Sequence, residues 1–160
     1  MKSHNRSYFS LTINDLKKLK KLALKENEEF FKRNPHLKSA YYNSLIGICL
    51  CQGAASHYLN PSVGIKDFDI WFFYVKDDSI YFQCRKPKRI KKAYKGKPID
   101  FLRRAIPKYI CNFNPNDPEK TIMEYLKVKN TKTKIELLEK AIIGLYPNGI
   151  FGKELWRGKL

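Results

Sequence analysis

The sequence predicts an α/β (α+β) protein in which a small mixed sheet is flanked by an N-terminal helix and C-terminal helices. Residues 12–33 carry apolar side chains at helical spacing, with lysines between them. Residues 44–52 and 67–75 are apolar runs of strand length, and the second is rich in aromatic and β-branched residues. Helix-start signals follow at Asp117 and Thr133. We expect the helices to pack on one face of the sheet.

The N-terminal helix has signals at both ends. Thr12 and Asp15 have the spacing of a capping box, in which each side chain bonds to the backbone of the other residue. The helix is predicted to run to about Arg33, because Asn34-Pro35 disfavours its continuation. Its apolar face consists of Leu16, Leu19, Ala23 and Phe30. A second helical stretch is predicted over 38–43.

The middle of the chain begins with an ambiguous apolar run. Residues 44–52 fit a strand buried on both faces, and a buried helix fits them nearly as well, because periodicity does not separate the two. Gly53 to Leu59 predict a short helix entered from a turn of small residues, and 60–64 predict a loop.

The strand predicted over 67–75 ends at a turn formed by Asp77, Asp78 and Ser79. Residues 80–84 are expected to return as its hairpin partner. The segment 85–97 is strongly basic and contains no acidic residue. The alternating stretch 99–102 predicts a further short strand.

The last third of the chain predicts two helices. Asp117 precedes Pro118, which is the arrangement of a capping residue followed by proline in the first turn. Thr133 and Glu136 form a second capping box, and the helix that follows is expected to reach Pro147. Its apolar face would consist of Ile135, Leu138, Ile142 and Leu145.

The length of 160 residues suits a single domain. We interpret 40–104 as its core and 115–146 as its C-terminal helices. Phe151 and Trp156 in the tail are expected to pack against the rest.

The formal net charge of +17 favours polyanionic partners, because it raises their local concentration around the protein. No apolar run is long enough to span a membrane, and no apolar signal segment follows the basic N-terminus. The cysteines form no Cys-x-x-Cys pair, so we interpret them as buried, reduced thiols of a cytoplasmic protein: Cys49, Cys51, Cys84 and Cys111. A zinc site that includes His57 is the less favoured alternative.

Two carboxylates begin the second strand. Asp67 and Asp69 are two residues apart, so on a strand both side chains lie on one face, roughly 6–7 Å apart. The turn of small residues at Gly53-Ala54 precedes them, and Asp100 follows on a later strand. Carboxylates suit divalent metal ions, and a small-residue turn at a helix N-terminus suits phosphate.

These motifs resemble those of the nucleotidyltransferase superfamily that shares the fold of DNA polymerase beta, and in particular its small, uncharacterised prokaryotic members. The resemblance lies in residues 52–58, 64–71 and 96–102 and covers roughly 40–145. It implies Mg²⁺-dependent or Mn²⁺-dependent transfer of a nucleoside monophosphate from an NTP to a hydroxyl group of an acceptor. The resemblance does not identify the NTP, the acceptor or the oligomeric state.

The resemblance also implies roles for individual residues. Asp67, Asp69 and Asp100 stand at the metal-binding carboxylates, and Asp100 would also orient or deprotonate the acceptor hydroxyl. Gly53 and Ala54 stand where the superfamily has its phosphate-binding Gly-Gly or Gly-Ser. Because Ala54 lacks a hydroxyl, a contact from Ser56 is the alternative. Further candidates for neutralising phosphate charge are Lys66, Lys97, Arg103 and Arg104.

Other interpretations stay open. Asp100 could simply pair with Arg103 or Arg104, and the basic run 85–97 could be either a solvated loop or a contact for RNA or DNA. A nucleotidyltransferase-like protein that has lost catalysis and binds nucleic acid is the main alternative function. A toxin–antitoxin-type interaction partner is a further alternative.

Overall fold

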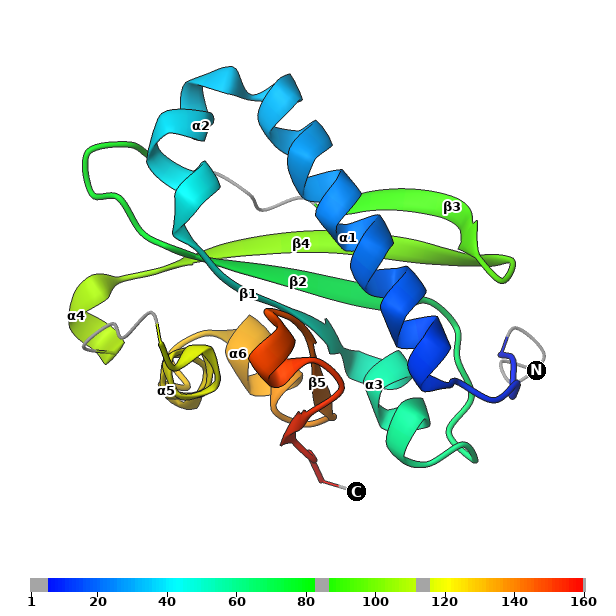
Figure 1. Ribbon diagram of the computed structural model, residues 1–160. Coiled ribbons are helices and arrows are strands. Elements are labelled where there is room, and N and C mark those ends of the chain that lie inside the picture. The colour runs from blue at the N-terminus through cyan, green and yellow to red at the C-terminus, as the bar shows by residue number, and fades with distance from the viewer. Residues whose placement is uncertain (1–5, 83–86, 112–115, 160) are drawn as a thin grey trace.

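A computed structural model describes residues 6–82, 87–111 and 116–159 (Figure 1). The helices are α1 (Ile13–Arg33), α2 (Pro35–Tyr41), α3 (Gln52–Leu59), α4 (Lys108–Cys111), α5 (Pro118–Lys127) and α6 (Lys132–Leu137), with 3-10 turns η2 (Tyr42–Ser44) and η3 (Asn148–Ile150). The strands are β1 (Leu45–Cys51), β2 (Phe68–Val75), β3 (Lys88–Tyr94), β4 (Lys97–Ile106), β5 (Ile142–Tyr146) and β6 (Glu154–Trp156). The protein is therefore a mixed α+β structure, as the sequence predicts.

The strands form one six-stranded sheet with the order β3-β4-β2-β1-β5-β6. β2 and β4 are parallel, and the other neighbouring strands are antiparallel. Because β2 and β4 run in the same direction, the residues that begin them lie at one end of the sheet. Figure 1 shows this end at the right, beside α3, whereas α4 follows the other end of β4 at the left.

Helices cover both faces of the sheet, so the expectation that they pack on one face is wrong. Strand residues alternate between the two faces, and one set packs with the apolar side of α1, with α2 and with α3. The other set packs with α5 and α6. β1 and β2 are buried on both faces, which explains why their sequences are apolar runs and not alternating patterns.

The N-terminal helix begins and ends where the sequence predicts. The Thr12 hydroxyl accepts a hydrogen bond from the Asp15 backbone, and the Asp15 carboxylate accepts one from the Thr12 backbone at 2.7 Å. The Asn34 backbone N–H bonds to the carbonyl of Phe30 and ends the helix. Among the described residues, no helix is both long and apolar enough to cross a membrane.

One predicted helix is shorter in the structure, and a strand follows it. The second C-terminal helix begins earlier, with Thr131 as its capping residue, and ends at Leu137. Residues 142–146 then form β5 beside β1, because the apolar residues there are buried by strand pairing. The tail does pack as expected, since the indole N–H of Trp156 donates to the Leu138 carbonyl at 2.7 Å.

The prediction that residues 80–84 form a strand paired with β2 is also wrong for the residues that the structure describes. Residues 80–82 form no strand, and residues 83–84 lie outside the described residues. The Tyr41 hydroxyl accepts from the Asp77 backbone N–H at 3.0 Å and lies 2.9 Å from the Ile80 carbonyl, so this segment is held by a side chain. The edge next to β2 is instead taken by β4.

Candidate functional site

A row of polar side chains crosses four strands on the face that α5 and α6 cover in part. Strand pairing places Cys51 of β1 opposite Asp69 of β2, Asp69 beside Asp100 of β4, and Asp100 opposite Arg89 of β3. The alternation of strand residues assigns all four side chains to the same face. Two of the three predicted metal-binding carboxylates are therefore direct neighbours.

Arg89 joins the row to Asp67, which precedes β2. Its Nη2 atom lies 2.7 Å from Oδ2 of Asp100 and 2.9 Å from Oδ2 of Asp67, while its Nε donates to Oδ1 of Asp100 at 2.9 Å. The guanidinium thus binds Asp100 in a bidentate manner and bridges two carboxylates. The hydrogen bonds raise the pKa of Arg89 above its ordinary value, and the bond to Asp100 contributes most.

Asp69 is the carboxylate of the group that Arg89 does not contact. Within the described part of the chain it accepts no hydrogen bond and forms no ion pair. Burial, followed by the negative charges of Asp67 and Asp100, raises the pKa of Asp69 to about 7. Arg89 and Lys140 oppose this shift only in part. Ionisation of Asp69 is therefore unfavourable at this place, and a bound cation would favour its charged form.

The N-terminus of α3 lies directly beside these carboxylates, because β1 ends at Cys51 and α3 begins at Gln52. Gln52 makes the sharp turn with φ of 62°, a left-handed conformation that is uncommon for a residue with a side chain. No side chain caps this helix end, and a Cβ atom placed on Gly53 would meet no atom within 4 Å. The start of α3 thus has no capping side chain, which is the kind of helix end that can bind an anion.

The other two residues of the predicted phosphate-binding turn serve the fold. Ala54 is fully buried in the core between α1 and the sheet. The buried Ser56 hydroxyl accepts a hydrogen bond from the Ala141 backbone at 3.2 Å and so fixes the start of β5. The structure therefore leaves the backbone around Gly53 as the phosphate-binding candidate.

The predicted basic residues are divided between the two faces. Lys66 is exposed in the segment before β2, and Lys97 is half-buried at the start of β4. Arg104 shares the face of Asp100 and lies over the Trp71 ring at 4.9 Å. Arg103 points to the opposite face.

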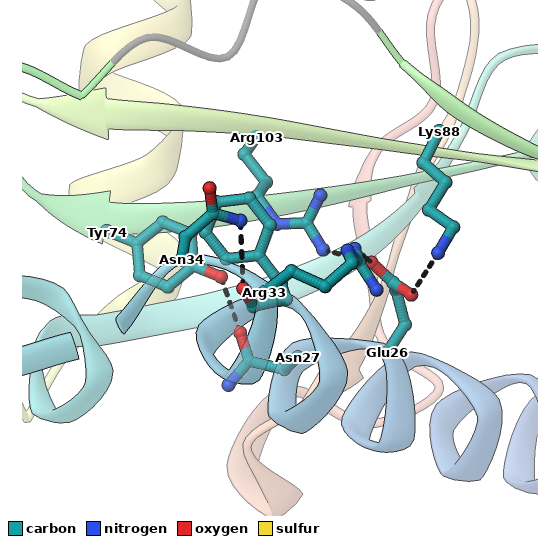
Figure 2. A network of polar contacts seen from close by, with 8 residues as sticks. Glu26, Asn27, Arg33, Asn34, Tyr74, Lys88 and Arg103 are labelled. Atoms are coloured by element: carbon teal, nitrogen blue, oxygen red, sulfur yellow. Dashed lines mark hydrogen bonds and ion pairs between the residues drawn. The ribbon is translucent and has the colours of Figure 1, made fainter. Parts of the chain in front are cut away.

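The contacts of Arg103 there are with the buried carboxylate of Glu26. Figure 2 shows Glu26 between Arg103, Arg33 and Lys88. Its Oε2 atom lies 2.7 Å from Arg103 and 2.8 Å from Arg33, and its Oε1 atom lies 3.6 Å from Lys88. Arg103 also stacks on the Phe30 ring at 3.9 Å. This cluster joins α1 to the sheet and is separate from the candidate site.

The basic run 85–97 is largely structural where it is described. Residues 88–94 form the edge strand β3, whereas 85 and 86 lie outside the described residues. Lys88, Arg89 and Lys95 form ion pairs with described residues, and that of Lys95 with Asp15 spans 3.0 Å. Lys91 and Lys92 are exposed.

Sequence reasoning missed the roles of Arg89 and Lys140. Arg89 was one basic residue among many, and no local pattern distinguishes it. Its place opposite Asp100 depends on an irregularity in the β3–β4 pairing between Ile90 and Tyr94. Lys140 approaches Asp69 only because β5 pairs with β1.

The donor chemistry of the carboxylate group fits Mg²⁺ or Mn²⁺, which prefer oxygen ligands. In the described ranges, however, no group of three His, Cys, Asp or Glu side chains is gathered around one point as a metal requires. Arg89 accounts for this arrangement, since it holds Asp67 and Asp100 toward itself. A metal ion would therefore have to displace the Arg89 guanidinium from one or both carboxylates.

The alternative zinc site finds no support in the described residues. Cys49 and Cys51 are buried, and burial raises the pKa of the Cys49 thiol to about 12. Both ring nitrogens of His57 contact backbone carbonyls, those of Val63 and Phe9. Cys84 lies outside the described residues.

Comparison of the chain with protein-family models, with curated proteins and with solved structures finds no match.

Proposed function

We propose that the protein is a Mg²⁺-dependent or Mn²⁺-dependent nucleotidyltransferase that moves a nucleoside monophosphate from an NTP to an acceptor hydroxyl. The observation that carries the proposal is the adjacent pair Asp69 and Asp100, with Asp67 beside them and the open N-terminus of α3 next to them. The buried Asp69 carboxylate, which has no hydrogen-bond or ion-pair partner among the described residues and lies beside Asp100, supports a cation at this place.

Each group has a role in this reaction. The N–H groups at the start of α3 would bind the triphosphate, since Gly53 leaves room for close approach of phosphate to the backbone. Asp67, Asp69 and Asp100 would hold the metal ions. When bound, such ions neutralise phosphate charge and position the reacting oxygens. Lys140 would add positive charge around the leaving pyrophosphate.

The reaction itself is a substitution at phosphorus. The acceptor oxygen forms a bond to the α-phosphorus of the NTP, and the bond between that phosphorus and pyrophosphate breaks. Asp100 would orient the hydroxyl and take up its proton, which then passes to solvent. For this role the Arg89 guanidinium has to leave Asp100, because it occupies both carboxylate oxygens.

Calorimetric titration of ATP, CTP, GTP and UTP, with and without Mg²⁺, tests the proposal. We expect metal-dependent binding of at least one NTP that the double substitution Asp67→Asn/Asp69→Asn abolishes. Asp78→Asn is the matched control, because Asp78 is exposed in the turn after β2. The absence of metal-dependent binding for all four NTPs, or binding that survives the double substitution, would refute the proposal.

A second candidate function is nucleic-acid binding without catalysis, which the two ion pairs of Arg89 favour. If Arg89 permanently takes the place of the cation, the carboxylates serve only the fold. Affinity for nucleic acid would then fall steeply with salt, ignore Mg²⁺ and survive Asp67→Ala. Both candidates suit a cytoplasmic protein, the setting that the buried free thiols favour.

A further inference from the structure

A pocket of about 330 Å³ lies at the end of the sheet opposite to the carboxylates. Lys76 follows β2 and Pro107 follows β4, so the pocket forms where these two parallel strands end. In Figure 1 this is the left end of the sheet, where α4 begins. Tyr125 of α5 and Lys134 of α6 form another wall. We call it the tyrosine pocket, since it also contains Tyr81 and Tyr109.

The charge of the tyrosine pocket is entirely positive. Lys76, Arg104 and Lys134 line it, and no acidic residue is found among the described residues that do so. Lys134 is only 5% exposed, and its Nζ atom lies 4.0 Å from the Tyr125 ring centre and 3.0 Å from Asn130 Oδ1. Lys134 forms no ion pair with any described residue. A buried lysine without a carboxylate partner favours an anionic ligand.

The tyrosine pocket also presents exposed aromatic rings. Tyr81 is 69% exposed and Tyr109 is 86% exposed, the two highest values among the large apolar side chains in the described ranges. Neither hydroxyl has a hydrogen-bond partner in the described part of the chain. Exposed aromatic rings beside lysine and arginine are the arrangement with which proteins bind single-stranded nucleic acid, because bases stack on the rings and the cations contact phosphates.

The tyrosine pocket and the candidate site share one face of β4. Arg104 lines the pocket, and Asp100 lies four residues earlier on the same face. At the rise of a β-strand this spacing corresponds to about 13 Å. A single strand of a few nucleotides could therefore lie in the pocket and bring a terminal hydroxyl to the carboxylates.

We propose that the tyrosine pocket binds single-stranded nucleic acid, with bases stacked on Tyr81 and Tyr109 and phosphates held by Lys76, Arg104 and Lys134. The net charge of +17 favours this polyanion over a protein partner, for which the lysines would be a hindrance at an apolar interface. The pocket's further role as the acceptor site rests on the proposed function. In that role the terminal hydroxyl of the strand is the nucleophile.

Fluorescence anisotropy with a labelled oligo(dT) or oligo(U) of twelve nucleotides tests the binding, in EDTA and without NTP. We expect salt-dependent binding that Tyr81→Leu/Tyr109→Leu weakens about tenfold or more, since stacking on each ring contributes about 1–3 kcal/mol. Tyr8→Leu is the matched control, because Tyr8 is 54% exposed and does not line the pocket. Circular dichroism of each variant verifies that it is folded.

A second pair of variants separates the pocket from the general charge of the protein. We expect Lys76→Gln to weaken binding more than Lys18→Gln, which removes one exposed positive charge from α1. Equal losses in the two lysine variants, or unchanged binding in the tyrosine double variant, would overturn the proposal. So would equal competition by duplex DNA, or binding of an acidic peptide in place of the oligonucleotide.

The acceptor role needs a separate measurement, in which the same oligonucleotide is incubated with Mg²⁺ and the NTP that binds. Extension by one or more nucleotides that Tyr81→Leu/Tyr109→Leu reduces would support the role. Binding without extension would overturn the acceptor role and leave the pocket standing. NTP binding without any oligonucleotide binding would overturn the pocket and leave the nucleotide site standing.

Discussion

Two groups of carboxylates and cations lie back to back on the opposite faces of β4. On the face that packs with α1, Arg103 binds Glu26, which also contacts Arg33 and Lys88 (Figure 2). On the other face, Asp100 lies beside Asp69 and binds Arg89. Both groups contain a half-buried or buried carboxylate, and both include a cationic side chain of β3, which is Lys88 in the first group and Arg89 in the second.

The two groups differ in the balance of charge around their central carboxylate. Glu26 has three cations close to it, and their hydrogen bonds and charges hold its pKa below the usual value despite the opposing effect of burial. Asp69 has no direct partner in the described residues, and burial, followed by the two carboxylates beside it, raises its pKa to about 7. A fully compensated group stabilises the fold, whereas an uncompensated one marks a candidate for ligand binding.

The largest effect on folding stability is expected from a substitution of Glu26. Glu26→Ala should lower the free energy of unfolding by about 3–5 kcal/mol, because it leaves the buried Arg103 without its carboxylate. Glu29→Ala is the control, since the exposed pair of Glu29 with Lys32 contributes about 0–1 kcal/mol. Urea denaturation measures both. Equal small losses would mean that the Glu26 group is not structural.

In contrast to Glu26→Ala, the substitution Asp69→Asn is expected to raise the free energy of unfolding in EDTA. The folded-state pKa of about 7 exceeds the ordinary value of 3.8, so the unfolded chain loses this proton first. The contribution of Asp69 to wild-type stability should therefore fall as the pH rises from about 4 to about 7. Asn does not titrate, and its variant should be more stable by about 1–4 kcal/mol at pH 8 and nearly unchanged at pH 4. Urea denaturation at both pH values measures the change in the free energy of unfolding. A variant that is less stable than the wild type at pH 8 would contradict the proposed difference between Asp69 and Glu26.

A smaller effect is expected at Arg89, the cation that a metal ion must displace. Arg89→Gln should strengthen Mn²⁺ binding about tenfold, or by about 1.4 kcal/mol, because it removes a competing positive charge from Asp67 and Asp100. Electron paramagnetic resonance of free Mn²⁺ measures the affinity. Lys91→Gln, an exposed change on the same strand, should leave it unaltered. Weaker binding in the Arg89 variant would indicate that Arg89 positions the carboxylates for the ion.

The smallest expected effect separates the two faces. Thr12→Ala removes the capping hydrogen bond of α1 and should lower the free energy of unfolding by about 1 kcal/mol. Because α1 packs on the face opposite to Asp69, the affinity for metal and NTP should stay unchanged. Thermal unfolding and calorimetry on the same sample measure both quantities. A parallel loss of affinity would show that the two faces are coupled.

Features that depend on residues close together in the chain were predictable from the sequence. The capping box of Thr12 and Asp15 begins α1, and Pro118 follows the capping Asp117 at the start of α5. The i, i+2 spacing of Asp67 and Asp69 fits the strand that begins at Phe68. Such signals lie within a few residues of one another, so no knowledge of strand pairing is needed to read them.

Strand alternation would have separated the two arginines of β4, had the strand been extended far enough. The predicted strand ended at residue 102, whereas β4 continues to Ile106. Once Arg103 and Arg104 both belong to the strand, only Arg104 can share the face of Asp100. The error was therefore in the length of the element and not in its type.

Which distant segments lie side by side depends on strand pairing, which local sequence patterns do not specify. Next to the turn, β3 and β4 pair Tyr94 with Lys97. If this register continued along both strands, Arg89 would lie opposite Leu102. The register shifts between Ile90 and Tyr94, however, so Arg89 lies opposite Asp100. Residues 142–146 have a spacing that suits a helix, yet β1 offers them an open edge, and they become β5. Hydrogen bonding between strands is non-local, and burial against a partner can override local helical preference.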